Sequence, residues 1–283
     1  MAETVSPAQS HPSAPSPRAR PAAPPLPGTG PLLGAQIRYQ LLLLMRNPRA
    51  LILSLVIPVL LLVLSSSRHA NLTPRTEEAL VAGLATFGLI VTAYISHAIG
   101  LVTSRQDGVL RRWRATPLPT WCYFAGKIAA TSLMALASVA IAIAAGMSLY
   151  HVHLTTGAAL SLLVIFTLGA LAWAAIGTAV TPLVPTAQAA GPVLMLTYLP
   201  VILFSGGLGS LSSEPGWLAT LARYLPAQPI IDAASRALGP AGGVLQIPGH
   251  DVAVLAAWAV AGVVASVCFF RWDPVRPRHA RQP

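Results

Sequence analysis

Long apolar stretches separated by short polar segments dominate this chain. A membrane-spanning helix needs about 20 mostly apolar residues. Five stretches with clear boundaries approach or exceed that length: residues 50–67, 79–103, 124–150, 157–180 and 252–270. A sixth, residues 187–211, is interrupted by Pro192, Pro200 and Gly206-Gly207, and we expect a kinked span because neighbouring helices can satisfy the carbonyls that proline leaves free. The pattern predicts an all-α integral membrane protein with six transmembrane helices.

Two different segments precede the first apolar stretch. Residues 1–31 contain nine prolines, and this composition buries too little apolar area to offset the entropy of ordering, so we expect a disordered tail and no signal peptide. Residues 31–46 predict an amphipathic helix in the membrane interface, ending before Pro48. Its expected apolar stripe is Leu33, Ile37, Leu41 and Leu44, with Gln36, Arg38, Gln40 and Arg46 largely off it. An extension of the first span is the alternative.

The segment before the last apolar stretch, residues 215–238, is amphipathic. Pro226 and Pro229 are expected to break it into two short helices. Trp217 and Tyr224 are residue types enriched at membrane interfaces. Because irregular backbone at membrane depth must be satisfied by protein or water, we expect a re-entrant helical hairpin in the outer leaflet.

The composition excludes an ordinary soluble enzyme. The chain is 54% hydrophobic and 9% charged, whereas soluble domains carry about 25% charged residues. No Asp, Glu, Lys or Arg occurs between Ile128 and Ser213. The net charge of +10 does not indicate a nucleic-acid partner, because the basic residues lie in short loops between apolar runs instead of on one face of a folded domain.

The distribution of basic residues predicts the orientation of the spans. With the N-terminus inside, 14 of the 18 Lys and Arg residues fall on the cytoplasmic side, as the positive-inside rule requires. The six-span domain is expected over residues 32–271, followed by a basic cytoplasmic tail, residues 272–283. Both termini are therefore expected in the cytoplasm.

The sequence predicts no catalytic, cofactor-binding or metal site. Gly126-Lys127 lacks the first glycine and the Ser or Thr of a phosphate-binding loop, with Trp121 and Ile128 at those positions. His151 and His153 lie without a nearby carboxylate or cysteine, and we interpret them as solvated residues of an external turn.

Polar and aromatic residues inside the apolar stretches are candidates for a substrate pathway. They are Thr92, Tyr94, Ser96 and His97 in the second stretch and Thr197, Tyr198 and Phe204 in the fifth. His97 is also consistent with a packing role near the interface. Few charges are expected inside the membrane, and a basic lining is absent from the pattern, so the pathway suits an amphiphilic or apolar cargo.

The long basic loop over residues 104–127 contains a short predicted helix, residues 109–115. Three arginines, Arg111, Arg112 and Arg114, flank Val109, Leu110 and Trp113. This arrangement fits either simple positive-inside anchoring or a surface that docks a partner.

Two motifs resemble those of the ABC type-2 permease family. In the loop, Asp107 to Arg112 is followed by Ala115-Thr116-Pro117-Leu118-Pro119 and by Gly126-Lys127. Before the last span, Pro215 to Leu218 is followed by Leu225-Pro226, Pro229 and Asp232 through Leu238. The resemblance covers roughly residues 32–271, and its drug-export branch, the daunorubicin-resistance permeases, is the most similar.

The resemblance implies a permease in a bacterial plasma membrane that exports a drug-like, natural-product or lipid-like amphiphile. It implies a dimer of permeases, with a second copy or a paralogue, docked on two separate ATPase subunits that bind ATP and Mg. The docking surface would be Asp107, Gly108, Val109, Leu110, Arg111, Arg112 and Trp113, together with the N-terminal interfacial helix. This chain has Ser104-Arg105-Gln106 where such permeases commonly carry Glu-Arg-Glu, which leaves Asp107 as the carboxylate available for coupling.

Two other classes remain open at the level of sequence. A secondary, ion-coupled transporter would place ionisable groups or broken helices mid-membrane in two related halves, and no such repeat is visible. A membrane-embedded protein without transport function, such as an enzyme, would need a cluster of His, Asp or Glu at one depth, and the spans offer His97.

Overall fold

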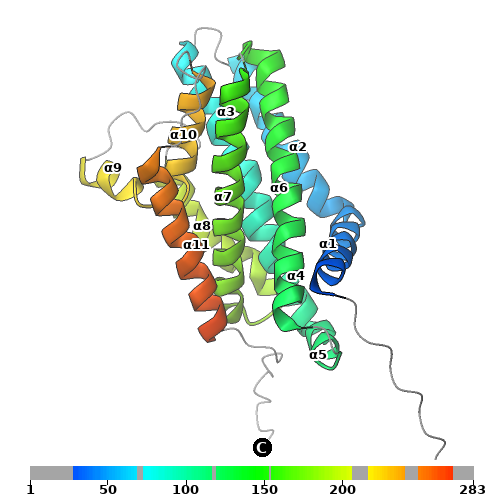
Figure 1. Ribbon diagram of the computed structural model, residues 1–283. Coiled ribbons are helices and arrows are strands. Elements are labelled where there is room, and N and C mark those ends of the chain that lie inside the picture. Colours follow the sequence, from blue (N-terminus) through cyan, green and yellow to red (C-terminus); the bar gives the residue numbers. More distant parts are fainter. Residues whose placement is uncertain are drawn as a thin grey trace, which may run out of the picture.

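The structure, a computed structural model, describes residues 28–68, 73–116, 119–152, 154–205, 216–239 and 248–269. This part of the chain is helical and contains no strand (Figure 1). The elements are α1 (Thr29–Met45), α2 (Pro48–Arg68), α3 (Pro74–Ile90), the π-helix η1 (Val91–Ser96), α4 (His97–Gln106), α5 (Val109–Arg114), α6 (Thr120–Tyr150), α7 (Thr156–Val180), the 3-10 helix η2 (Thr181–Leu183), α8 (Ala187–Phe204), α9 (Gly216–Ala222), α10 (Gln228–Leu238) and α11 (Gly249–Phe269).

Five helical stretches are long and apolar enough to cross a membrane. They are Pro74–Gln106, Thr120–Tyr150, Thr156–Leu183, Ala187–Phe204 and Gly249–Phe269. In α2 the apolar stretch within the described residues is shorter, Leu55–Ser66. The prediction of an all-α integral membrane protein is confirmed, whereas the count of six spans stays a prediction. Residues 1–27 of the predicted tail over residues 1–31, the predicted tail over residues 272–283 and the end of the predicted fifth span lie outside the described residues. Residues 29–31 are the start of α1, so the expectation of disorder was wrong there.

Helix α7 lies at the centre of the bundle and contacts α3, α4, α6, α10 and α11 (Figure 1). Small residues allow the closest of these contacts. A Cβ on Gly262 of α11 would lie 2.8 Å from the carbonyl carbon of Ala175 in α7, and a Cβ on Gly169 of α7 would lie 2.5 Å from Cδ1 of Ile230 in α10. Such contacts hold helices together in lipid, where van der Waals packing replaces the hydrophobic effect between helices.

The segment before the last helix forms two short helices, as its two prolines predict. Helix α10 turns a buried face, including Ile230, Ala234 and Leu238, toward α3 and α7. The connection between α9 and α10 is held to α11, because Trp258 Nε1 donates a hydrogen bond of 2.8 Å to the Tyr224 carbonyl. Helix α9 lies at the side of the bundle, well short of the end formed by the α6–α7 connection (Figure 1).

Helix α1 forms where the sequence predicts it and ends before Pro48, but the face that it buries includes two glutamines besides the predicted leucine stripe. Gln36 and Gln40, which the leucine stripe places off the apolar face, are its most buried residues. They lie against α6, where a Cβ on Gly126 would be 2.5 Å from Gln36 Cγ. Leu42 and Leu43 are instead 47% and 46% exposed. The predicted stripe Leu33, Ile37, Leu41 and Leu44 is half-buried, so α1 packs on that side with Gln36 and Gln40 beside the stripe, and Leu42 and Leu43, outside it, face the surroundings.

Candidate functional site

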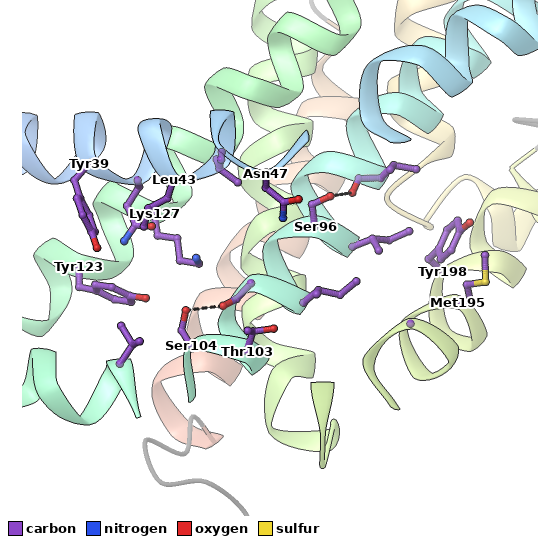
Figure 2. Close-up of a pocket in the computed structure, with 18 of the residues that line it drawn as sticks. Tyr39, Leu43, Asn47, Ser96, Thr103, Ser104, Tyr123, Lys127, Met195 and Tyr198 are labelled. Carbon is purple, nitrogen blue, oxygen red and sulfur yellow. Dashed lines mark hydrogen bonds between the residues drawn. The ribbon is translucent and has the colours of Figure 1, made fainter. Parts of the chain in front are cut away.

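A cavity of about 760 Å³ lies between α1, α2, the continuous α3–η1–α4 segment, α5, α6 and α8 (Figure 2). This volume falls within the range of small-molecule sites, roughly 300–1,000 Å³. Its lining consists of Tyr39, Gln40, Leu43, Leu44, Asn47, Ile57, Phe87, Val91, Ile95, Ser96, Ile99, Gly100, Thr103, Ser104, Val109, Trp113, Tyr123, Lys127, Gly191, Met195 and Tyr198. Most of these side chains are apolar or aromatic, so the cavity is suited to a largely apolar molecule.

A few polar groups gather on the α4 and α6 side of this cavity. The Lys127 side chain extends from α6 into the space that Asn47, Ser96 and Ser104 also face (Figure 2). Its amine lies over α4, because a Cβ on Gly100 would be 3.4 Å from Lys127 Nζ. The Ser104 hydroxyl already donates a hydrogen bond of 2.7 Å to the Gly100 carbonyl.

Two basic residues that the sequence assigns to the cytoplasmic loop are buried inside the fold. Lys127 is 9% exposed, because α6 begins at Thr120 and carries it into the bundle. Arg105 is fully buried in α4, where its guanidinium donates to the carbonyls of Thr181, at 3.3 Å, and Val184. Both residues are therefore buried basic groups in helices and not exposed residues of a loop. The helical register of α4 and α6 determines that these two side chains are buried. The pattern of basic residues in the sequence does not show this burial.

The π-helix η1 contains three of the predicted pathway residues, Thr92, Tyr94 and Ser96. Thr92 is buried, and its hydroxyl donates to the Gly88 carbonyl at 2.9 Å. The Tyr94 hydroxyl forms a hydrogen bond of 2.5 Å with the Thr197 hydroxyl of α8, and the Tyr94 ring packs on Trp173 with ring centroids 5.4 Å apart. Single π-helical turns inside α-helices occur frequently at functional sites. Here the π-helix links the wall of the cavity to α7 and α8.

The other predicted pathway residues are dispersed. His97 is buried between helices, with Nδ1 3.2 Å from the Thr131 hydroxyl and Nε2 2.9 Å from the Thr178 hydroxyl. Each ring nitrogen therefore lies within hydrogen-bond distance of a hydroxyl that itself donates to a backbone carbonyl, of Lys127 or of Ala174, and this arrangement between helices supports the packing role. Tyr198 does line the cavity, together with Ser96. Phe204, at the end of α8, does not line it and is 38% exposed.

Helix α5, the predicted docking element, begins after Gly108, which adopts the left-handed conformation with φ +69°. Leu110 is fully buried against Leu101 and Tyr123. The Trp113 ring lies 5.9 Å from Tyr39 and 5.8 Å from Tyr123. The apolar side chains of α5 therefore attach it to the bundle and are not presented as knobs to a partner.

The residues left exposed around α5 are charged. Asp107, Arg111 and Arg112 are all exposed on the surface of the molecule. Val109 and Trp113 also line the cavity. A force applied to the charged face of α5 would therefore reach the cavity wall directly.

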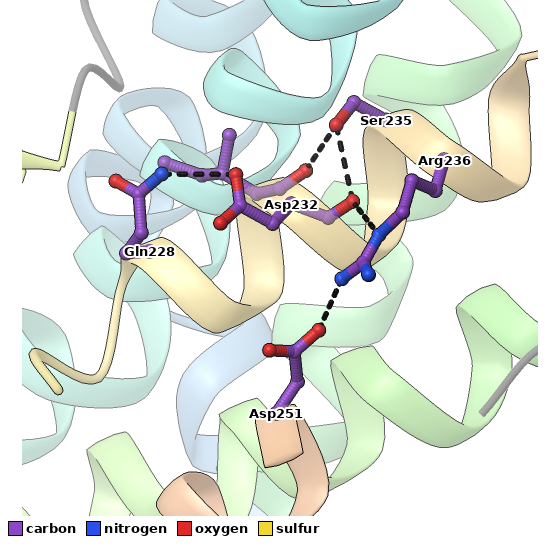
Figure 3. Close-up of polar contacts among 6 residues, drawn as sticks. Gln228, Asp232, Ser235, Arg236 and Asp251 are labelled. Atoms are coloured by element: carbon purple, nitrogen blue, oxygen red, sulfur yellow. Dashed lines mark hydrogen bonds and ion pairs between the residues drawn. The ribbon is translucent and has the colours of Figure 1, made fainter. Parts of the chain in front are cut away.

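A second polar cluster joins α10 to α11 (Figure 3). Arg236 forms an ion pair with Asp251, and its Nε donates to the Asp232 carbonyl at 2.9 Å. Gln228 Nε2 donates to the Asp232 carboxylate at 2.9 Å. Burial raises the pKa of Asp232, and the Gln228 hydrogen bond and the Arg236 charge oppose that effect. The sequence indicated Asp232 and Arg236 only as part of the family-like motif, because Asp251, the partner of Arg236, lies in a different helix.

A bundle of long apolar helices around an internal cavity, with a charged helix attached at one end, defines a polytopic membrane protein. The chain belongs to the ABC-2 type transporter family, whose match covers residues 31–238. The predicted family resemblance is thereby confirmed.

Curated relatives agree with this assignment. The chain is similar to the probable multidrug ABC transporter permease YbhR of Escherichia coli strain K12 and to that of Escherichia coli O157:H7, with 27% identity over 154 residues in each case. The match covers 54% of this chain and 40% of each relative. The chain therefore matches less than half the length of these relatives.

Proposed function

We propose that this chain is the transmembrane permease subunit of an ABC exporter and that a separate ATPase subunit, which binds ATP and Mg, docks on α5. Membership of the ABC-2 family supports the permease role, and the relatives' names contain the words multidrug and permease. The observation that carries the docking proposal is the geometry of α5. Its exposed Arg111 and Arg112 lie on a helix that Leu110 and Trp113 attach to the cavity wall.

Coupling follows from this attachment. Closure of the ATPase subunits would displace α5, and Trp113 would transmit the displacement to Tyr39 of α1 and Tyr123 of α6. ATP binding shifts such an equilibrium only if the ATPase dimer contacts the two permease conformations differently. Asp107, exposed at the end of α4, is the carboxylate available to pair with a basic residue of the partner.

The topology that we propose has six spans, with α2 as the first and with α1 in the cytoplasmic interface. Helices α9 and α10 would form the re-entrant hairpin in the outer leaflet, supported by the position of α9 beside the bundle and by exposed Trp217 and Tyr224 (Figure 1). The complex would contain two permeases, as a homodimer or with a paralogue, in a bacterial plasma membrane. Its cargo would be a drug-like, natural-product or lipid-like amphiphile, which suits the mainly apolar cavity.

Reversal of charge on α5 tests the docking proposal. We expect Arg112→Glu to reduce the ATP hydrolysis that copurifies with the tagged chain at least about fivefold, because a desolvated interface charge pair contributes roughly 2 kcal/mol or more. Arg75→Glu makes the same change at an exposed position at the start of α3 and should have no effect. Unchanged association in Arg111→Glu/Arg112→Glu would remove α5 from the interface.

Transport in proteoliposomes separates the exporter from its main alternative, a secondary transporter. Export that needs ATP and the ATPase subunit supports the permease role. Export that a proton gradient drives without the ATPase subunit contradicts it.

A further inference from the structure

Lys127 is the single lysine in the sequence, among 18 basic residues, and it lies in the cavity wall. It is 9% exposed. Within the described residues, Arg236 and Asp251 form an ion pair, and no carboxylate pairs with Lys127. No hydrogen bond to its amine is formed within the described residues either. The cavity thus contains a buried amine without a counter-charge.

A buried cation is costly unless an anion pairs with it. Around Lys127 the cavity supplies two neutral amides, Gln40 and Asn47, whose N–H groups can orient an anion without neutralising the lysine, whereas the Ser96 and Ser104 hydroxyls donate to the carbonyls of Val91 and Gly100. The ammonium of lysine is a compact charge with three donors, and its bonds to carboxylate or phosphate are charge-assisted. An anionic group entering from outside would complete this site.

The rest of the lining specifies the remainder of the ligand. Ile57, Phe87 and Ile95 provide apolar walls. Leu43 of α1 and Met195 of α8 line the cavity and are also 46% and 56% exposed on the bundle surface. An alkyl tail can therefore extend from the cavity into surrounding hydrocarbon.

We propose that this cavity binds an amphiphile with an anionic headgroup, and that the headgroup pairs with Lys127 while the tail lies along the apolar walls. Cationic amphiphiles are excluded, because they would place a second positive charge beside the first. The ligand is either an acidic lipid of the bilayer or an acidic cargo, and both present the same chemistry to the site. The identification of the ligand as cargo rests on the proposed transport function, whereas its binding depends only on the cavity.

Equilibrium binding of radiolabelled decyl phosphate to the protein in phosphatidylcholine nanodiscs tests this site. We expect saturable binding above that of empty nanodiscs, with unlabelled decyl phosphate competing and decyltrimethylammonium failing to compete. Lys127→Met keeps the apolar stem and should weaken binding about tenfold or more, the loss typical of a hydrogen bond to a charged group. Lys127→Arg should retain most of the affinity, and Arg75→Gln, which removes an exposed charge outside the cavity, should retain all of it.

Equal affinity in the wild-type chain and Lys127→Met, or equal competition by the cationic amphiphile, overturns the proposal. The competition experiment uses the wild-type chain and so does not depend on the folding of a variant. A direct readout is available because reductive ¹³C-methylation labels one side chain, and its NMR signal should shift with decyl phosphate and not with decyltrimethylammonium.

A second arm identifies the source of the ligand. In nanodiscs containing phosphatidylglycerol, displacement of decyl phosphate supports the site and assigns it to a bilayer lipid. Undiminished binding supports the site and assigns it to cargo. Charge-selective binding without ATP-driven export would contradict the transport proposal alone, and loss of ATPase association in Arg112→Glu without charge-selective binding would contradict this inference alone.

Discussion

At the scale of single residues, the buried side chains of Arg105, His97 and Lys127 have different surroundings. Arg105 is held by two backbone carbonyls, and His97 by two threonine hydroxyls. These groups join helices, since buried polar atoms in a bundle find partners on neighbouring elements. Lys127 differs, because its amine faces a cavity large enough for a ligand.

Asp232 provides a prediction with a definite sign. Because burial raises its pKa above the ordinary value of 3.8, the folded state binds the proton more tightly than the unfolded state. The stability that the neutral carboxyl contributes is present at low pH and is lost as the pH rises through the raised pKa. We therefore expect Asp232→Asn to raise the thermal unfolding temperature at pH 7, with the difference vanishing near pH 4.

The neighbouring carboxylate supplies the matched comparison for this experiment. Asp251→Asn makes the same chemical change but removes the ion pair with Arg236, so it should lower the unfolding temperature at pH 7. Thermal unfolding in detergent between pH 4 and pH 8 measures both variants. A lower stability of Asp232→Asn at pH 7 would contradict the assigned cost of ionising Asp232.

At the scale of elements, close approach of backbones decides which helices pair. Gly262 allows α11 to lie directly on Ala175 and Ile176 of α7, and Gly126 does the same for α1 on α6. A side chain at position 262 would meet backbone atoms of α7, which cannot rotate away, whereas one at position 126 would first meet the side chain of Gln36. The pairing of α7 with α11 therefore depends on the absence of a side chain at Gly262.

Substitution at this contact should destabilise the bundle. We expect Gly262→Val to lower the free energy of unfolding by roughly 1–3 kcal/mol, the usual cost of overpacking. Ala261→Val places the same side chain at the exposed neighbouring position and should change it little. Chemical denaturation of the two variants in detergent measures the difference, and equal stabilities would show that α11 can shift on α7 without cost.

At the scale of the whole molecule, α5 and the start of α3 lie at opposite ends of the bundle (Figure 1). The proposed orientation places α5 in the cytoplasm and the start of α3 outside, because cytoplasmic loops carry the excess of arginine. The described cysteines are free, with Cys122 buried and Cys268 exposed. Both can therefore be replaced to give a background for labelling.

Labelling of introduced cysteines tests this orientation. In a Cys122→Ala/Cys268→Ser background, we expect Arg75→Cys to react with a membrane-impermeant maleimide in intact cells. Asp107→Cys, exposed at the end of α4, should react only after permeabilisation. The reverse pattern would place α5 outside the cell and contradict docking of a cytoplasmic ATPase subunit.

The sequence by itself determined the class of the protein and the positions of its helices. Runs of about 20 apolar residues require lipid as solvent, and prolines mark helix ends at Pro48 and between α9 and α10. The family-like motif around Asp107 to Arg112 also identified α5, since its arginines are local in the chain. These features depend only on residues that are close in sequence, so they can be predicted without knowledge of the packing.

Only the tertiary structure decided which polar residues face the interior. Lys127 and Arg105 look like loop charges in the sequence, and Gln36 and Gln40 look like the polar face of α1, yet all four are buried. Each is buried because a helix from elsewhere in the chain covers it, and glycines such as Gly100 and Gly126 make room for the contact. The cavity arises in the same way, from eight elements whose contacts join residues far apart in sequence.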